Sequence, residues 1–145
     1  MKKSYIESTQ EAGAAVFSRN ISGEVIMLNL LRFKETTDYS ATPELSPKKP
    51  ISGREAFQKY INHTLPFLKE SGGELLFLGD GGRYLIGPQD EQRDFVMLVK
   101  QSSLASFMAF ASDRDYLVGI DHRIAAVMDT RLLPIVESFQ GKFLL

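Results

Sequence analysis

The clearest hydrophobic pattern in the chain is the stretch Val25–Phe33, which reads VIMLNLLRF. Seven of its nine residues are apolar, and they occupy both faces of an element with a period of two residues. An apolar run of this length is typical of a buried strand. We therefore expect Val25–Phe33 to form the central strand of a sheet.

Two polar residues, Asn29 and Arg32, interrupt this strand and fall on opposite faces of it. A buried neutral polar group costs on the order of 2–7 kcal/mol unless it forms a hydrogen bond. Both residues therefore need partners, and two explanations stay open. Either a ligand supplies them, or Asn29 ties down a neighbouring loop while Arg32 reaches solvent at the end of the strand.

Two capping boxes mark the starts of two helices. The first, Ser8–Glu11, predicts a short helix that ends near Arg19, within an N-terminal extension of residues 1–23. The second, Ser52–Glu55, begins a long amphipathic helix that ends in a left-handed cap at Gly72–Gly73. The apolar stripe of this helix consists of Phe57, Tyr60, Ile61, Thr64, Leu65 and Leu68.

Between the first strand and this long helix, residues 35–51 contain three prolines and few apolar side chains, which predicts a long loop. Loops of this length in compact domains are either functional covers or mobile insertions. The sequence leaves both possibilities open.

Further strands are expected in the second half of the chain. Glu74–Leu78 predicts a strand that is followed by a turn at Asp80–Gly82 and a short returning strand at Arg83–Ile86. Asp94–Lys100 is another apolar strand. The last strand is Arg131–Val136, and the proline within it indicates an edge position or a bulge.

Two more helices precede that last strand. Ser102 or Ser103 caps the first, which carries the apolar residues of Leu104–Ala111. Asp113 caps the second, whose apolar stripe runs from Tyr116 to Met128.

The order of these elements is βαββαβ, preceded by an extra N-terminal helix. This is the ferredoxin-like plan of an α+β protein with an antiparallel sheet. A chain of 145 residues suits one domain with its own core, so we expect a single domain over residues 1–145. The apolar share of 43% and the charged share of 24% are those of an ordinary globular protein.

Charge and composition exclude several kinds of partner. A formal net charge of −1 gives no basic footprint, so we do not expect nucleic acid as a partner. The chain has no cysteine, and no apolar run suits a membrane span or a signal peptide. We therefore expect a cytoplasmic protein without a membrane partner.

The sequence also gives little support for metal or cofactor chemistry. Its two histidines, His63 and His122, lie far apart and off the apolar stripes, and no paired-histidine spacing occurs. Neither a G-x-S-x-G elbow nor a phosphate-binding glycine loop is present. We expect no metal and no cofactor.

Several segments together resemble a known family. VIMLNLLRF, ISGREAF, GGELLFLG and the run SFMAFASDRDYLVGIDHRIAAVMDTRLLP are similar to segments of an uncharacterised family in the dimeric α/β-barrel superfamily. Relatives in that superfamily include antibiotic-biosynthesis-monooxygenase-like proteins, muconolactone isomerases and haem-dependent peroxidases. The resemblance covers about Val25–Pro134 and implies a ferredoxin-like fold, a homodimer and small-molecule chemistry. Members often carry a tryptophan where this chain has Gln92 and Arg93.

A set of polar residues on the predicted strands and helices could form a pocket. The candidates are Asn29, Arg32, Tyr60, Tyr116, Arg123, Asp129 and Arg131. Arginine would supply charge for an anionic or phenolic ligand, and tyrosine or asparagine would orient a carbonyl or enolate oxygen. The same arginines could equally form structural ion pairs with nearby aspartates. Two function classes follow: a cofactor-independent small-molecule enzyme of monooxygenase or isomerase type, and a non-catalytic homodimer that binds a metabolite.

The strands themselves predict the homodimer. Three of them are apolar on both faces, although a sheet with helices on one face normally alternates between apolar and polar residues. The face away from the helices would then expose a larger apolar patch than soluble monomers tolerate. The N-terminal helix and the C-terminal residues 139–145 are too short to cover it. We therefore expect a second copy to pack sheet to sheet about a two-fold axis.

Overall fold

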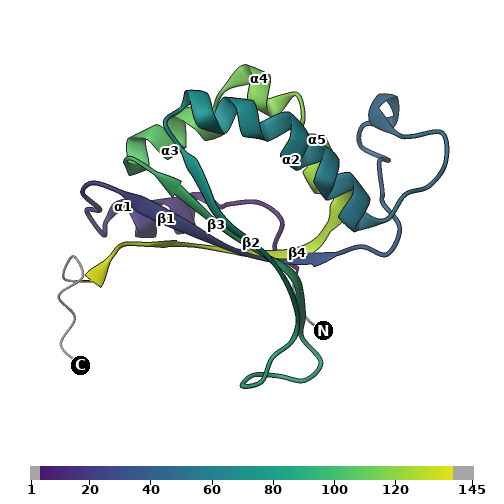
Figure 1. Cartoon of the computed structure of the whole chain (residues 1–145), viewed down its shortest axis with the longest axis horizontal. Helices are drawn as coiled ribbons and strands as arrows, with labels where there is room; N and C mark the ends of the chain where they lie inside the picture. Colours follow the sequence, from purple (N-terminus) through teal and green to yellow (C-terminus); the bar gives the residue numbers. More distant parts are fainter. Residues whose placement is uncertain (1–3, 139–145) are drawn as a thin grey trace.

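The computed structural model describes residues 4–138, and helices α2 to α5 lie on one face of a four-stranded sheet (Figure 1). The tail of residues 139–145 lies outside the described range. The helices are α1 (Gln10–Phe17), α2 (Gly53–Glu70), α3 (Leu104–Ala111), α4 (Arg114–Leu117) and α5 (Ile120–Ala126), with a 3-10 helix η1 at Pro43–Leu45. The strands are β1 (Val25–Phe33), β2 (Glu74–Arg83), β3 (Gln92–Gln101) and β4 (Val127–Ile135).

The sheet is antiparallel and has the strand order β2-β3-β1-β4. β1 is central and has the bounds that the hydrophobic pattern predicted. It pairs with β3 from Val25↔Gln101 to Leu31↔Phe95, and with β4 along its other edge. This order, with helices in both crossovers, is the ferredoxin-like α+β fold, which confirms the predicted fold class.

The core lies between the sheet and the helices. Alternate residues of β1, from Val25 to Leu31, point to this side and are buried. Phe57 of α2 is 1% exposed and packs its ring against Phe33, with the ring centroids 5.4 Å apart. Asn29 belongs to this buried face, so the polar residue in the middle of the strand lies under the helices.

Side-chain caps explain where the helices begin. At α2 the predicted capping box is present, because Ser52 accepts from the amide of Glu55 and the Glu55 carboxylate accepts from the amide of Ser52. At α1 the cap is Thr9, one residue later than the predicted box, and its hydroxyl accepts from the amide of Ala12. After α2, Gly72 has a φ of +84°, which is the predicted left-handed cap.

The predicted turn at Asp80–Gly82 is wrong, and so is the returning strand at Arg83–Ile86. β2 continues through these glycines, and the chain reverses only in residues 84–91. The reason is the close approach of the two strands, since a Cβ on Gly81 would collide with the carbonyl oxygen of Arg93. Glycine here serves strand pairing and not a turn.

The helical stripe predicted from Tyr116 to Met128 is too long, and the last strand begins before the predicted Arg131. α5 ends at Ala126 and β4 begins at Val127, which pairs with Phe33. The apolar residues at this junction fit either period, and pairing with β1 selects the strand. β4 is an edge strand, as the proline within it indicated.

The long loop comprises residues 35–51, and its first part forms hydrogen bonds with α5. Tyr39 is buried, and its hydroxyl lies 2.8 Å from Nδ1 of His122. The amide of Asp38 donates to the carbonyl of Ala125 at 3.1 Å. His122, which the sequence placed off the apolar stripe of its helix, is therefore a partner of the loop.

Candidate functional site

Two adjoining hollows lie at the end of the sheet where β1 ends and β3 begins. Their volumes are about 360 Å³ and about 710 Å³. Both are lined by Ser4, Arg32 and Met128, so they meet at Arg32. Volumes of roughly 300–1,000 Å³ are usual for small-molecule sites.

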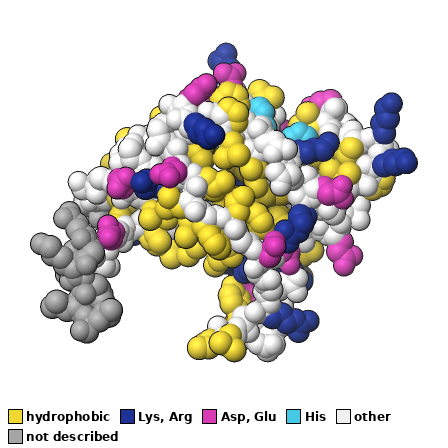
Figure 2. All heavy atoms as spheres, in the orientation of Figure 1, with side chains coloured by type: hydrophobic (Ala, Val, Ile, Leu, Met, Phe, Trp, Pro, Cys, Tyr) yellow, Lys and Arg dark blue, Asp and Glu magenta, His cyan; other side chains and the backbone are white. Residues whose placement is uncertain are grey.

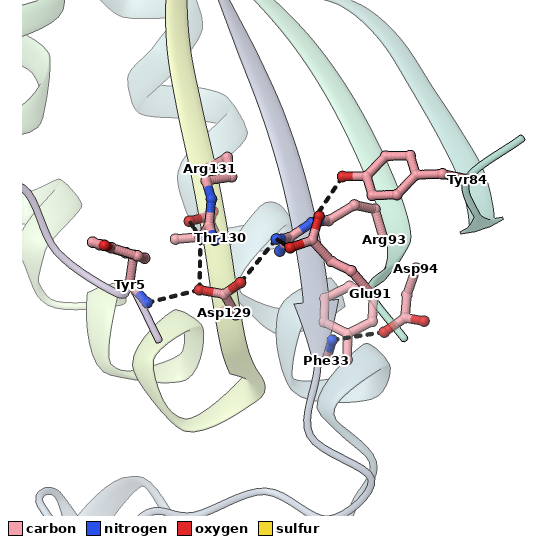
Figure 3. A network of polar contacts seen from close by, with 9 residues as sticks. All are labelled: Tyr5, Phe33, Tyr84, Glu91, Arg93, Asp94, Asp129, Thr130 and Arg131. Carbon is pink, nitrogen blue, oxygen red and sulfur yellow. Dashed lines mark hydrogen bonds and ion pairs between the residues drawn. The ribbon is translucent and has the colours of Figure 1, made fainter. Parts of the chain in front are cut away.

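A network of charged side chains forms a wall of the smaller hollow (Figure 3). Asp129 of β4 is at its centre, and its Oδ1 accepts from the amide of Tyr5 at 2.7 Å and from Nη1 of Arg131 at 2.8 Å. Its Oδ2 accepts from Nη2 of Arg93 at 2.9 Å. The same nitrogen lies 3.7 Å from Oε1 of Glu91. Because Arg93 comes from β3 and Asp129 from β4, their ion pair spans the strand between them.

Both members of this ion pair are charged at neutral pH. The side chain of Arg93 is 3% exposed and that of Asp129 is 15% exposed. Burial alone would raise the pKa of Asp129, but the hydrogen bonds from Tyr5, Arg131 and Arg93 lower that pKa below its usual range. Burial alone would lower the pKa of Arg93, but the Tyr84 hydroxyl and Asp129 raise it.

Two arginines at the smaller hollow have donors that the described chain does not use. Nη1 of Arg93 is buried and has no hydrogen-bond partner. Arg32 is half-buried, and within residues 4–138 its side chain has no hydrogen-bond or ion-pair partner. With Arg131, the hollow is lined by three guanidinium groups against the carboxylates of Glu91 and Asp129, an excess of one positive charge. Such a wall suits a small anion.

Three of the seven predicted pocket residues come together here, namely Arg32, Asp129 and Arg131. Register brings them together, because Arg32 pairs with Asp129 across the strands and Arg131 lies two residues farther along the same face. Arg123 is close to this region but donates to the carbonyl of Ile6 at 3.2 Å.

The other three predicted residues, Asn29, Tyr60 and Tyr116, lie in the core and line neither hollow. Nδ2 of Asn29 donates to the carbonyl of Met27 at 3.2 Å. The hydroxyls of Tyr60 and Tyr116 lie 2.9 Å apart in a buried hydrogen bond. Burial, with a further contribution from Tyr60, raises the pKa of Tyr116.

Arg93, Glu91 and Tyr5 are parts of the network that sequence reasoning missed. A signal for Arg93 was available, because it lies in β3 two residues before the apolar run Phe95–Val99. Nothing in the sequence indicated that Tyr5 belongs to the site. Tyr5 reaches it because the N-terminal residues run beside β4, where the amide of Thr130 donates to the Tyr5 carbonyl at 2.8 Å.

The described part of the chain offers neither a metal site nor a membrane span. Within residues 4–138, no three His, Asp or Glu side chains gather closely enough to hold a metal ion. Over the same range no helix combines the length and the apolar character that crossing a membrane requires.

The chain is similar to two crystal structures of a protein named RPA0582. The structure of methylated RPA0582 has 31% sequence identity and a TM-score of 0.82, over 96% of this chain and 98% of that chain. The other, RPA0582 from Rhodopseudomonas palustris, a protein of unknown function, has 30% identity and a TM-score of 0.77, over 92% and 96%. The chain belongs to the RPA0582 family.

Membership in the RPA0582 family confirms the resemblance to an uncharacterised family with a ferredoxin-like fold. A DABB family protein with a ferredoxin-like fold from Mesorhizobium loti is also similar, with 10% identity and a TM-score of 0.44 over 81% of this chain and 99% of that chain. No family model and no curated protein matches the chain. RPA0582 is itself of unknown function, so this similarity assigns no activity to the chain.

Proposed function

We propose that this protein is a homodimer that binds a small organic anion with an apolar body. The anionic group would lie against Arg32, Arg93 and Arg131 in the smaller hollow. The observation that carries the proposal is the unused donor capacity of Arg32 and Arg93. A guanidinium without an acceptor is costly when it is shielded from water, and a carboxylate or phosphate would supply that acceptor.

The two hollows supply the two halves of such a ligand site. The lining of the larger hollow combines polar residues, among them Lys34 and Glu35, with five apolar ones. The apolar ones are Ile6, Phe33, Ile124, Val127 and Met128. The smaller hollow supplies the charge, and the two meet at Arg32. An aliphatic or aromatic carboxylate would fill both, whereas an inorganic ion would use only the arginines.

Binding is favoured over an enzyme of monooxygenase or isomerase type by the charge state of Asp129. Such an isomerase needs a group beside the ligand that exchanges a proton near neutral pH. The hydrogen bonds that lower the pKa of Asp129 make it a weak base, and arginine does not release its proton in this range. We therefore favour a metabolite-binding protein over a catalyst.

The homodimer would form through the sheet face opposite α2 and α5. Register places eight apolar side chains there, of which Phe77 and Leu133 are more than half exposed. The eight are Ile26, Leu28, Leu30, Phe77, Val96, Leu98, Leu133 and Ile135.

The charges at the two ends of this face are complementary. At one end Lys100 lies 3.4 Å from both Glu24 and Glu74, an excess of one negative charge. At the other end are the arginines of the smaller hollow, with an excess of one positive charge. A two-fold axis perpendicular to the strands would bring the acidic end of one copy to the arginine end of the other.

Calorimetric titration with a series of carboxylates from acetate to octanoate tests the ligand proposal. We expect octanoate to bind more tightly than acetate, and Arg32→Gln to weaken octanoate binding by about 10–100-fold, because a hydrogen bond to a charged group contributes about 1.5–3 kcal/mol. Arg114→Gln is the matched control, since Arg114 is exposed and the same charge is removed. Equal affinities of the two variants, or no binding at millimolar octanoate, would contradict the proposal.

The dimer is tested separately by light scattering during size exclusion at micromolar concentration. We expect a mass near twice 16.3 kDa. A mass near 16.3 kDa would show that the sheet face is not a stable interface under these conditions.

A further inference from the structure

The connection between β2 and β3 carries two neighbouring side chains that make almost no contact with the rest of the protein. We call residues 84–91 the hairpin arm. Leu85 is 98% exposed and Ile86 is 91% exposed. The arm projects from the end of the sheet on the side opposite the helices (Figure 1), and hydrophobic side chains lie at its tip (Figure 2).

The tip has a defined conformation that presents these side chains outward. The amide of Glu91 donates to the carbonyl of Pro88 at 3.3 Å, and Nε2 of Gln89 donates to the carbonyl of Tyr84 at 3.0 Å. Gly87 packs so closely on the ring of Tyr84 that a Cβ there would lie 2.9 Å from ring atoms. Leu85 and Ile86 differ from other exposed apolar residues in being almost fully exposed at the tip of a projecting hairpin, where only a partner could cover them.

We propose that Leu85 and Ile86 of each copy pack against the second copy, so that two hairpin arms clasp the homodimer. This inference rests on the proposed dimer. The proposal is supported by the direction in which the arm projects, which is toward the side of the apolar sheet face (Figure 1). A second copy that covers this face would therefore lie beside the arm. Two-fold symmetry would then place the second arm against the first copy.

The charges near the tip favour a second copy over a membrane. Apolar tips that enter anionic lipid are normally flanked by an excess of lysine or arginine. Here Arg83 precedes the tip, and Asp90 and Glu91 follow it, so the flanks carry no basic excess.

The hairpin arm also belongs to the anion site. Pro88 and Glu91 line the smaller hollow, and the hydroxyl of Tyr84 accepts from Nε of Arg93 at 3.4 Å. A tip held by the second copy would hold this wall in place. Through this wall dimerisation and anion binding are coupled, and each changes the other by the same factor.

The double variant Leu85→Ser/Ile86→Ser tests the clasp, with Leu117→Ser/Val118→Ser as the control. The control residues are also adjacent, exposed and apolar, but they lie at α4 in the helix layer. Sedimentation equilibrium over a dilution series gives the dimer dissociation constant. We expect the arm variant to raise it at least tenfold and to weaken octanoate binding, while the control changes neither by more than about twofold.

Each other outcome has a defined meaning. An unchanged dissociation constant in the arm variant, or an equal change in the control, overturns the clasp and leaves the homodimer standing. A monomeric wild-type protein overturns the homodimer and the clasp together. Binding of the wild type to phosphatidylcholine–phosphatidylglycerol vesicles that is lost in the arm variant, with dimerisation unchanged, overturns the clasp and assigns the tip to a membrane. Circular dichroism should show that the arm variant folds, because both replaced side chains are exposed.

Discussion

The central carboxylate of the charged network offers a direct test of the site geometry. In Asp129→Asn the three hydrogen bonds that this side chain accepts lose their charged acceptor. Arg93, which is 3% exposed, then keeps only the more distant Glu91 as a counter-charge, at 3.7 Å. The NH2 group of the new asparagine would also point at an N–H donor in either orientation of the amide, because both carboxylate oxygens accept hydrogen bonds in the wild type.

The size of the effect follows from burial. Removing one partner of a buried ion pair costs about 3–5 kcal/mol. Glu91 remains as a second partner and Arg131 is 40% exposed, so we expect a smaller loss of about 2–3 kcal/mol in the free energy of unfolding. The matched control is Asp80→Asn, which breaks the ion pair to Arg54 at 2.8 Å. Its partners are 52% and 77% exposed, so its loss should stay below about 1 kcal/mol.

Urea unfolding at several pH values measures both variants. The pKa of Asp129 is lowered by folding, so its stabilising effect is complete above the ordinary carboxyl value of 3.8 and is lost as the pH falls through the lower folded value. The difference in the free energy of unfolding between wild type and Asp129→Asn should therefore persist from pH 7 to pH 5 and shrink only in stronger acid. Equal losses in Asp129→Asn and Asp80→Asn would refute the argument from burial.

Two further sets of substitutions test the close packing of the sheet and the core. Gly81→Ala should lower the free energy of unfolding by about 1–3 kcal/mol, because the new Cβ would collide with the backbone of β3. Gly82→Ala in the same strand is the control: its Cβ meets open space, so thermal unfolding should show a change within about 0.5 kcal/mol. Tyr60→Phe and Tyr116→Phe should each lower the free energy of unfolding by about 1–2 kcal/mol, because each leaves the other hydroxyl without its partner. The double variant should lose no more than either single one, since no hydroxyl is then left unpaired. Additive losses in the double-mutant cycle would contradict the shared hydrogen bond.

Much of the fold could be predicted because several local signals agreed. The apolar run of β1 has the predicted bounds, and the capping box at Ser52 begins α2. The errors occurred where a local signal has two structural meanings. The glycines after Leu78 suit either a turn or a tightly paired strand, and contact with β3 selected the strand. Val127 fits either a helical stripe or a strand, and its pairing with Phe33 decided between them.

The site could be predicted only in part, for a related reason. Arg32, Asp129 and Arg131 drew attention as polar residues on or near predicted strands, but their meeting depends on the register of β1 with β4. Tyr60 and Tyr116 were equally reasonable candidates by residue type, and packing of α2 against α4 joined them to each other instead. Residue type indicated the chemistry, and only tertiary pairing showed which side chains share a hollow.

The position of Arg93 argues that this network serves binding as well as stability. Replacing a buried ion pair with apolar residues is often neutral or stabilising, by as much as about 1–4 kcal/mol. Apolar residues in place of both Arg93 and Asp129 would thus destabilise the fold little. Instead β3 carries a guanidinium that is 3% exposed, and one nitrogen of that group has no acceptor. Arg32, at the same hollow, also lacks an acceptor within residues 4–138. Arg32 and Arg93, which come from different strands and line one hollow, thus both carry donors without an acceptor, and this supports the proposal that an anion completes the network.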